Sequence, residues 1–259
     1  MRYEILGPLR VVDGHNHSFI SAQKVETLFA VLLICAEQIV SPAQLMKELW
    51  GDQLPKRATA GLHVYISQLR KFLHRPHRQH NPVVTQQTGY VLRMGTDTLD
   101  LHTFSDLAAQ GRALAKERCY EPAADCFERA LSLWHGPVLS NLGNGPILDG
   151  FTTWLTETRM ECQEMLTDVH LHLGRHRELI GPLYSLTCEY PLRETLYRQL
   201  MLALYRSERK ADALHVYQRA RRTLNDELGL EPCRALRDLH QAILADDQRL
   251  SLLTASLAG

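Results

Sequence analysis

The spacing of apolar residues changes along this chain of 259 residues, and each change predicts a different kind of secondary structure. Before residue 20, short apolar runs such as Leu9 to Val12 alternate with the turn-forming pairs Gly7-Pro8 and Asp13-Gly14. Short apolar runs bounded by such pairs are typical of small β-strands. We therefore expect two or three short strands before the first helix.

Three helices follow, marked by apolar residues at helical spacing and by residues that start or stop helices. Ser41-Pro42 is typical of a helix start, because serine caps the first turn and proline fits its first position. Gly51 and Pro55 then indicate a turn, and Pro76 follows the third helix. The expected helices cover residues 22–36, 42–50 and 58–73.

A β-hairpin is expected next. The β-like runs Val83 to Thr85 and Tyr90 to Arg93 flank the turn residues 86–89. Strands, three helices and a closing hairpin make the outline of a winged helix-turn-helix domain, which we place at residues 1–96. The outline by itself fits equally well a small α+β domain that has no nucleic-acid partner.

Beyond residue 97 the pattern is helical almost throughout, so the fold class is mainly α with small β elements. Residues 174–179 recur as residues 208–213, an offset of 34, and residues 118–123 are a weaker copy. This period predicts tetratricopeptide-like helix pairs with a groove for protein partners. We assign residues 97–246 to this helical domain and 247–259 to a flexible tail. The expected helices cover residues 101–116, 122–134, 146–173, 177–189, 193–207, 210–227 and 232–245.

The charges are balanced over the whole chain but not along it. Lys+Arg and Asp+Glu each number 29, yet residues 1–98 hold 11 basic and 7 acidic residues, and residues 99–259 hold 18 and 22. Between Asp52 and Asp97 there is no acidic residue, but there are seven Lys/Arg and four His. An acid-free basic window of this kind indicates a polyanionic partner.

Several classes of protein are excluded by what the sequence lacks. The longest apolar run, Leu28 to Ala36, is about half the length of a membrane span, and residues 1–12 do not resemble a signal peptide. We therefore expect a cytoplasmic, nucleoid-associated protein without a membrane partner. The six cysteines form no CxxC pair, which favours reduced thiols. No catalytic motif is found, so we expect neither an enzyme nor a cofactor.

The third helix, residues 58–73, has two distinct faces at 100° per residue. Its apolar seam consists of Leu62, Ile66, Leu69 and Leu73. The opposite side carries small and polar residues, as a recognition helix needs if its backbone is to enter the major groove. A surface helix with a solvated basic face would show the same pattern, but the acid-free window and the flanking hairpin favour recognition.

Individual roles follow from side-chain chemistry. Gln68 can read adenine, the outward-facing Val64 suits a thymine methyl group, and Arg70 and Lys71 suit phosphates or guanine. Polar side chains at the hairpin tip can reach the minor groove or the DNA backbone. Trp50 is either a phosphate donor or a core residue. The candidate DNA contacts are Trp50, Lys56, Arg57, Thr59, His63, Val64, Tyr65, Ser67, Gln68, Arg70, Lys71, Arg75, Arg78, Thr85, Gln86, Gln87, Thr88, Tyr90 and Arg93.

A metal site is the weaker interpretation of the segment from His74 to His80. His74, His77 and His80 are spaced H-x2-H-x2-H, but a zinc site requires about four ligands on rigid elements. These three lie in a proline-containing loop without a nearby cysteine or carboxylate. We expect a basic loop near phosphates and no metal.

An ordered series of short motifs resembles the Streptomyces antibiotic regulatory protein family of bacterial transcriptional activators. Each motif is weak alone, but together they cover about residues 1–246 in the family's order. The motifs are Leu6-Gly7-Pro8-Leu9, Leu49-Trp50-Gly51-Asp52, Val64-Tyr65-Ile66-Ser67-Gln68-Leu69-Arg70-Lys71, Thr88-Gly89-Tyr90, Ala130-Leu131-Ser132-Leu133-Trp134-His135-Gly136-Pro137, Pro191-Leu192-Arg193-Glu194, Gln199-Leu200-Met201-Leu202-Ala203-Leu204-Tyr205-Arg206, Ala213-Leu214-His215-Val216-Tyr217 and Glu227-Leu228-Gly229-Leu230-Glu231-Pro232.

The resemblance implies a response-regulator type winged helix followed by a bacterial transcriptional activation domain. It implies a protein that binds direct repeats of double-stranded promoter DNA near the −35 element as a homodimer and recruits RNA polymerase holoenzyme. The genes controlled would belong to a secondary-metabolite cluster. Many relatives carry a basic residue in place of Gln68, so the operator sequence is left open.

Two other functions fit the same residues. Affinity for DNA does not distinguish activation from repression, so a repressor would show the same recognition helix. A helical adaptor could instead use the basic N-terminal module to bind an acidic protein.

Overall fold

The computed structural model describes residues 1–76, 80–139, 142, 145–247 and 250. The chain divides into two compact units. Unit 1 contains Met1–Leu107 and Ala130–Met160, and unit 2 contains Ala108–Arg129 and Glu161–Gly259. The winged helix expected at residues 1–96 therefore lies within unit 1, together with a later part of the chain.

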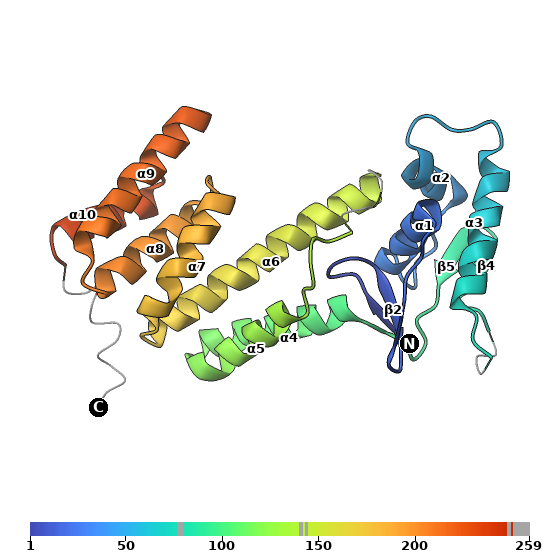
Figure 1. The fold of residues 1–259 in the computed structure, drawn as a ribbon, viewed down its shortest axis with the longest axis horizontal. Helices are drawn as coiled ribbons and strands as arrows, with labels where there is room; N and C mark the ends of the chain where they lie inside the picture. Colours follow the sequence, from blue (N-terminus) through green and yellow to red (C-terminus); the bar gives the residue numbers. More distant parts are fainter. Residues whose placement is uncertain (77–79, 140–141, 143–144, 248–249, 251–259) are drawn as a thin grey trace. The chain divides into compact units, whose positions relative to one another are not determined.

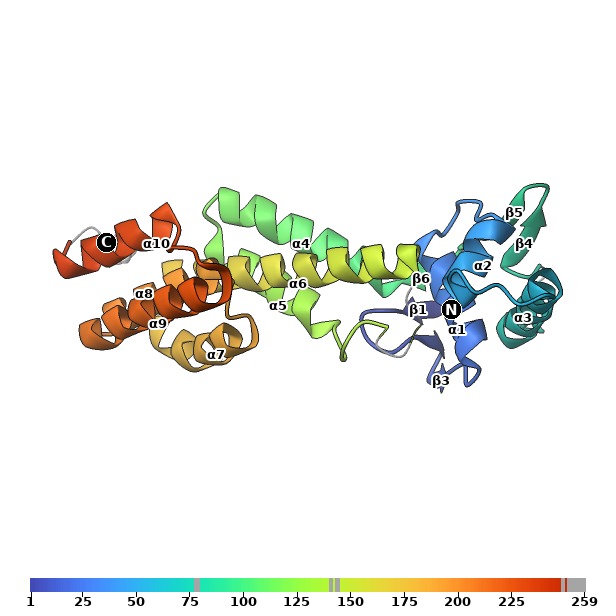
Figure 2. The same ribbon diagram turned by 90° about the horizontal axis from the view of Figure 1, so that it is seen from above.

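The N-terminal strands form a four-stranded sheet in the order β3-β2-β1-β6. Figure 2 labels β1, β3 and β6 of this sheet. The strands are β1 (Arg2–Glu4), β2 (Arg10–Asp13), β3 (Asn16–Ser18) and β6 (Thr98–Leu99). The first three are antiparallel neighbours, which confirms the expected small strands before the first helix. β6 pairs in parallel with β1. The sequence did not predict β6, because two residues carry no periodic signal.

Three helices and a hairpin complete the winged helix (Figure 1). α2 starts with a capping box, in which the Ser41 side chain accepts from the Gln44 backbone N–H and the Gln44 side chain accepts from the Ser41 N–H. This pairing explains why the serine-proline signal located the helix start correctly. The helices are α1 (Gln23–Ile34), α2 (Pro42–Trp50) and α3 (Ala58–Leu73), and the hairpin strands are β4 (Val83–Gln86) and β5 (Gly89–Leu92).

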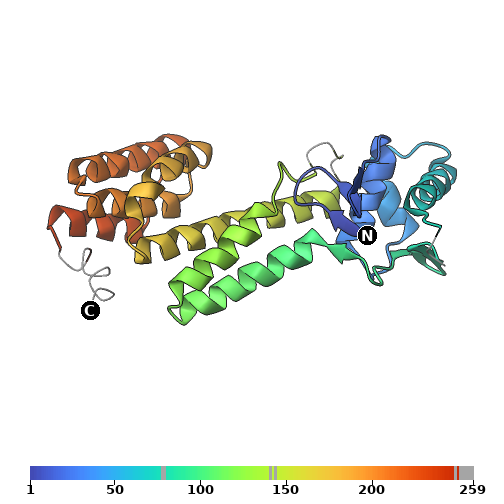
Figure 3. The ribbon, with the colours of Figure 1, turned by 60° about the horizontal axis from the view of Figure 1, so that its bottom comes forward.

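The rest of the described chain is mostly helical, and its helices follow the expected segments closely. Every helix end lies within a few residues of its predicted position. In unit 2 the helices α7 to α10, coloured gold to red, stack side by side (Figure 3). The helices are α4 (Asp100–Lys116), α5 (Tyr120–Ser132), α6 (Pro146–His172), α7 (His176–Glu189), α8 (Glu194–Arg206), α9 (Lys210–Leu228) and α10 (Arg234–Leu244).

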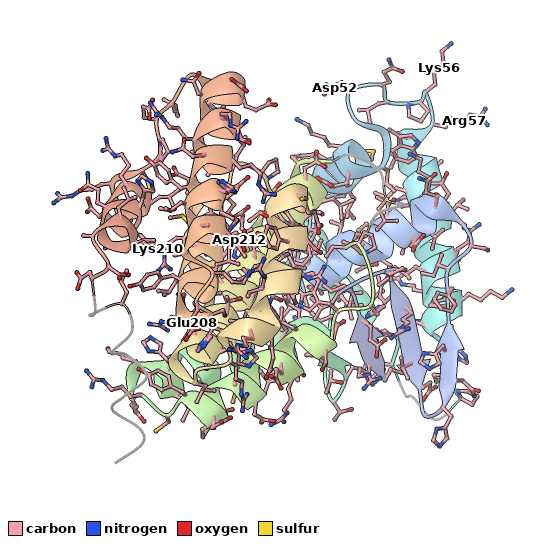
Figure 4. The ribbon with its side chains drawn as sticks, turned by 60° about the vertical axis from the view of Figure 1, so that its left-hand side comes forward. Asp52, Lys56, Arg57, Glu208, Lys210 and Asp212 are labelled. Atoms are coloured by element: carbon pink, nitrogen blue, oxygen red, sulfur yellow. The ribbon has the colours of Figure 1, made fainter. Side chains whose placement is uncertain are left out.

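The sequence repeat corresponds to a repeated turn. Arg118, Gly174, Glu208 and Asp246 each follow a helix with a positive φ of 62°, 76°, 64° and 56°, respectively. The residue after each of them donates its N–H to the carbonyl five residues earlier, at 2.9–3.0 Å. Such a left-handed residue ends a helix, and those at Arg118, Gly174 and Glu208 are followed by α5, α7 and α9, respectively. Glu208 is labelled in Figure 4. The same turn is thus repeated in the backbone, and the step from Gly174 to Glu208 has the expected spacing of 34 residues.

Two sequence-distant motifs meet within unit 1. The backbone N–H of His135 donates to the Leu6 carbonyl at 3.0 Å, and that of Leu139 donates to the Gly7 carbonyl at 3.2 Å. A Cβ at position 7 would lie 2.6 Å from the His135 ring, so only glycine permits this approach. The Leu6-Gly7-Pro8-Leu9 motif is therefore a docking segment for the loop that follows α5.

A buried carboxylate makes the second connection between these parts of unit 1. Glu48 of α2 is only 3% exposed, and its Oε1 accepts from the Ile147 N–H at 2.8 Å. Its Oε2 accepts from the Leu148 N–H at 3.3 Å. A carboxylate is stabilised at a helix N-terminus because unpaired N–H groups and the helix dipole both favour negative charge. Glu48 therefore anchors the first turn of α6 to α2.

Removing this anchor should destabilise the protein. We expect Glu48→Ala to lower the free energy of unfolding by about 1–3 kcal/mol, because two N–H groups lose their acceptor. Gly145→Ala should have a similar effect, since its Cβ would lie 2.1 Å from Glu48 Oε2. Urea denaturation measures both variants, with the exposed Glu227→Ala as the control. Unfolding midpoints equal to the wild type for both variants would show that Glu48 is not an anchor.

Acid should destabilise unit 2 through two histidines. Burial and the nearby Arg206 lower the pKa of His172 and of His176 below the ordinary value of 6.5. The unfolded chain therefore binds protons more readily, and the stability present above about pH 6.5 decreases as the pH falls below it. We expect lower urea midpoints for the protein at pH 6.0 than at pH 7.5. The double variant His172→Phe/His176→Gln should weaken this dependence, whereas the exposed His215→Gln should leave it unchanged.

Candidate nucleic-acid interface

The two faces of α3 are arranged as its sequence predicts. The seam residues Leu62, Ile66, Leu69 and Leu73 are buried, with exposures of 0–2%. The opposite side is solvent-exposed, and Val64 is 52% exposed despite its apolar side chain. We call this side the outward face of α3, and it consists of Ala60, His63, Val64, Ser67, Gln68 and Lys71.

The small residues on α3 also serve its packing against α2. The rings of Trp50 and Tyr65 lie 5.9 Å apart, and a Cβ on Gly61 would lie 3.3 Å from the Trp50 ring. Thr59 Oγ1 lies 3.9 Å from the Met46 sulfur. The sequence left open whether Trp50 is a phosphate donor or a core residue. In the structure its ring packs against α3 and is partly exposed.

The hairpin of β4 and β5 is the wing, and its turn consists of Gln87 and Thr88. Thr85, Gln86, Gln87 and Thr88 are all exposed at this tip, whereas Tyr90 is only 7% exposed. The Tyr90 N–H donates to the Val40 carbonyl at 3.0 Å, and the Val40 N–H donates to the Tyr90 carbonyl at 2.8 Å. Tyr90 is therefore a buried anchor of the wing, whereas the polar tip is exposed to solvent.

Glycine at position 89 is required by close packing in the wing. A Cβ there would lie 2.2 Å from the Val40 carbonyl oxygen, far inside van der Waals contact. This explains the Thr88-Gly89-Tyr90 motif, since the glycine admits Val40 and the tyrosine is paired with it.

The base of the wing is fixed by a carboxylate from the turn after α1. Glu37, with φ 63°, accepts from Arg93 Nη1 at 2.8 Å and from the Met94 N–H at 2.6 Å. These two hydrogen bonds lower the pKa of Glu37. Arg93 therefore has a partner inside the protein.

The remaining basic candidates fall into two groups. Arg75 is bound to Asp13 at 2.8 Å and also donates to the carbonyls of Phe72 and His74, so it holds the end of α3. Lys56, Arg57 and Lys71 are exposed, and none of the ion pairs found among the described residues involves them. Figure 4 shows Lys56 and Arg57 extending from the loop between α2 and α3. Arg78 and His77 lie outside the described residues.

One residue of the wing was missed by the sequence reasoning. Asn81 donates through Nδ2 to the Arg70 carbonyl at 2.8 Å, and its Oδ1 accepts from the Val83 N–H at 3.0 Å. The pair Asn81-Pro82 predicts a turn. It does not predict that the Asn81 side chain contacts α3, because that contact depends on the tertiary structure.

Two negative findings apply to the described residues alone. No group of three or more His, Cys, Asp or Glu side chains among them could hold a metal ion. No helix in the same set of residues has the length and apolar character needed to cross a membrane.

A winged helix with an exposed small and polar face on α3, followed by helices joined by a repeated turn, is typical of DNA-binding transcription regulators. Two family models agree with this. Residues 20–92 match the model "Transcriptional regulatory protein, C terminal", and residues 99–244 match "Bacterial transcriptional activator domain".

Several regulators are similar along almost the whole chain. Transcriptional regulator RedD of Streptomyces coelicolor is 36% identical, covering 97% of this chain and 72% of RedD. Regulatory protein DnrI of Streptomyces peucetius is 34% identical, covering 95% of this chain and 93% of DnrI. Regulatory protein AfsR of Streptomyces griseus is 35% identical, but the matched region spans only 25% of AfsR.

A solved structure shows the same fold. Mycobacterium tuberculosis EmbR, in a complex with a low-affinity phosphopeptide, aligns with a TM-score of 0.88 and 30% identity, covering 98% of this chain and 69% of EmbR. The chain belongs to the Streptomyces antibiotic regulatory protein family. The relatives that the chain matches over most of their length, RedD and DnrI, are named as a transcriptional regulator and a regulatory protein.

The close approach at Gly89 gives a direct test of how the wing is held. Gly89→Ala should disrupt the pairing of Val40 with Tyr90 and lower the free energy of unfolding by more than about 2 kcal/mol. Gly150→Ala is the matched control, because nothing lies within 4 Å of a Cβ at that position in α6. This control should be neutral or slightly stabilising. Equal urea midpoints for the two variants would contradict the close approach.

Proposed function

We propose that this protein is a transcriptional activator that binds direct repeats of promoter DNA next to a −35 element as a homodimer. It recruits RNA polymerase holoenzyme to that promoter. Its targets belong to a secondary-metabolite gene cluster, and it acts in the cytoplasm at the nucleoid. The winged helix of residues 1–96 binds DNA and the helical domain of residues 97–246 mediates activation.

The observation that carries the DNA-binding part is the outward face of α3 beside the polar wing tip. Small side chains at Ala60 and Ser67 let the helix backbone approach the floor of the major groove. Val64 supplies an exposed apolar contact suited to a thymine methyl group, and Gln68 can form two hydrogen bonds to adenine.

Charge supports the same surface. Lys56, Arg57 and Lys71 are exposed and are not in ion pairs among the described residues, so they are available to phosphates. With roughly five to seven phosphate contacts, the logarithm of affinity should fall with the logarithm of salt concentration with a slope of about −4.5 to −6.

The polymerase-recruiting part is supported by the activator-domain match over residues 99–244. Direct repeats about one helical turn apart would place two protomers on the same side of the DNA, where a polymerase could contact both. Because the chain spans only 25% of AfsR, the activity of that whole protein is not transferred to it.

Footprinting on neighbouring promoters, with and without RNA polymerase and at two salt concentrations, tests the proposal. Tandem protection beside the −35 element that polymerase strengthens is the expected result. Protection that excludes polymerase would identify a repressor instead. No protection at low salt would rule out DNA binding and favour the helical adaptor.

Two substitutions on α3 should separate affinity from specificity. Lys71→Ala should weaken binding to all sequences and reduce the salt slope by about 0.9, because one phosphate contact is lost. Gln68→Ala should change the preference at one base pair by about 1–3 kcal/mol. Fluorescence anisotropy with a panel of duplexes measures both, and the exposed Lys116→Ala is the charge-matched control. Unchanged binding in both α3 variants would show that α3 is not the recognition helix.

A further inference from the structure

The side chain of Arg70 is directed at the wing. Its Nε donates to the Val83 carbonyl at 3.0 Å, and its Nη2 donates to the Thr85 hydroxyl oxygen at 2.7 Å. Both acceptors lie on β4, two residues apart. A planar guanidinium can satisfy two such acceptors at once, whereas a lysine ammonium cannot reproduce the fork.

Asn81 reinforces the same connection from the other side. It links the Arg70 carbonyl at 2.8 Å to the Val83 N–H at 3.0 Å. Arg70 thus makes two direct hydrogen bonds from the last turn of α3 to β4, and Asn81 bridges the same two elements with one hydrogen bond to each. We call this set the Arg70 clasp.

The clasp acts on the strand of the wing that has less support. β5 is held by the Val40–Tyr90 pairing and by the Glu37 N–H, which donates to the Leu92 carbonyl at 3.0 Å. β4 pairs with β5 on one edge of this two-stranded sheet. An isolated two-stranded hairpin is marginally stable, so contacts from outside determine where its tip lies. For β4, the Arg70 clasp supplies such contacts from the recognition helix itself.

We propose that Arg70 is a positioning residue that fixes the wing tip relative to the outward face of α3. It thereby sets the spacing between the base pairs read in the major groove and the flanking DNA contacted by the wing. The proposal rests on the proposed DNA-binding function and gives Arg70 a role different from the direct phosphate or guanine contact expected from sequence. In this role its guanidinium stays on Val83 and Thr85 while the protein is bound to DNA.

A double-mutant cycle in the full chain tests the positioning role. The variants are Arg70→Ala, Thr85→Val and their combination, and Thr85→Val removes the acceptor without changing the charge. Affinity is measured for a duplex selected by the wild-type protein from a random library, and for the same duplex shortened on the wing side. Lys71→Ala is the control for a direct phosphate contact.

The expected result has three parts. Arg70→Ala should weaken binding to the full duplex about tenfold, the loss that one charge-assisted hydrogen bond would produce. The double variant should be no weaker than Arg70→Ala, because both changes break the same clasp. On the shortened duplex, Arg70→Ala and the wild type should bind equally, whereas Lys71→Ala should remain weaker. Arg70→Lys should restore only part of the lost affinity.

Additive losses, or a loss of the same size on the shortened duplex, would overturn the proposal and return Arg70 to a direct DNA contact. Amide hydrogen exchange of the free protein keeps the test independent of DNA binding. Arg70→Ala should raise exchange at residues 84–88, whereas Lys71→Ala should not. Unchanged exchange at these residues would exclude the clasp, even if the wild-type protein bound no DNA and the proposed function had failed separately.

Discussion

The buried carboxylate of Glu48 at the first turn of α6 is the interaction on which the arrangement of unit 1 depends. Glu48 belongs to α2 of the winged helix. The N–H groups that donate hydrogen bonds to its carboxylate lie about a hundred residues later in the chain. The backbone pairing of Gly7 with the loop after α5 is a second attachment between the same segments. The first turns of α4 and of α6, which lie in the region matched by the activator-domain model, thus belong to the same compact unit as the winged helix.

This attachment explains why the family motifs are scattered along the chain. Gly7 is a glycine because the His135 ring occupies the space of its Cβ, and Gly145 is a glycine because the Glu48 carboxylate does so. Gly89 admits the Val40 carbonyl in the same way. The motifs that contain Gly7 and Gly89 look weak in sequence because their partners are distant, and each of these two has a steric reason once the partner is known. The outward face of α3 and the wing tip stay exposed.

Much of the local structure follows from local rules. The ranges predicted for α2 and α3 are those observed, because the capping serine, the following proline and the apolar seam all act within one or two helical turns. The repeated turns at Gly174 and Glu208 were visible as a 34-residue similarity for the same reason, and the turn at Arg118 as a weaker copy. β6 was missed because a two-residue strand exists only through its pairing with β1.

The sequence by itself determined the helices, the buried seam of α3 and the small or polar character of its outward face, since each depends on residues three or four positions apart. It also determined the basic window, which is a matter of composition. Only the tertiary structure decided which of the basic side chains have hydrogen-bond or ion-pair partners within the protein. Arg70, Arg75 and Arg93 look equivalent in sequence to Lys56 and Lys71, but their guanidinium groups are held by Thr85, Asp13 and Glu37. Hydrogen-bond partners far apart in sequence are fixed by the fold and leave no periodic signal.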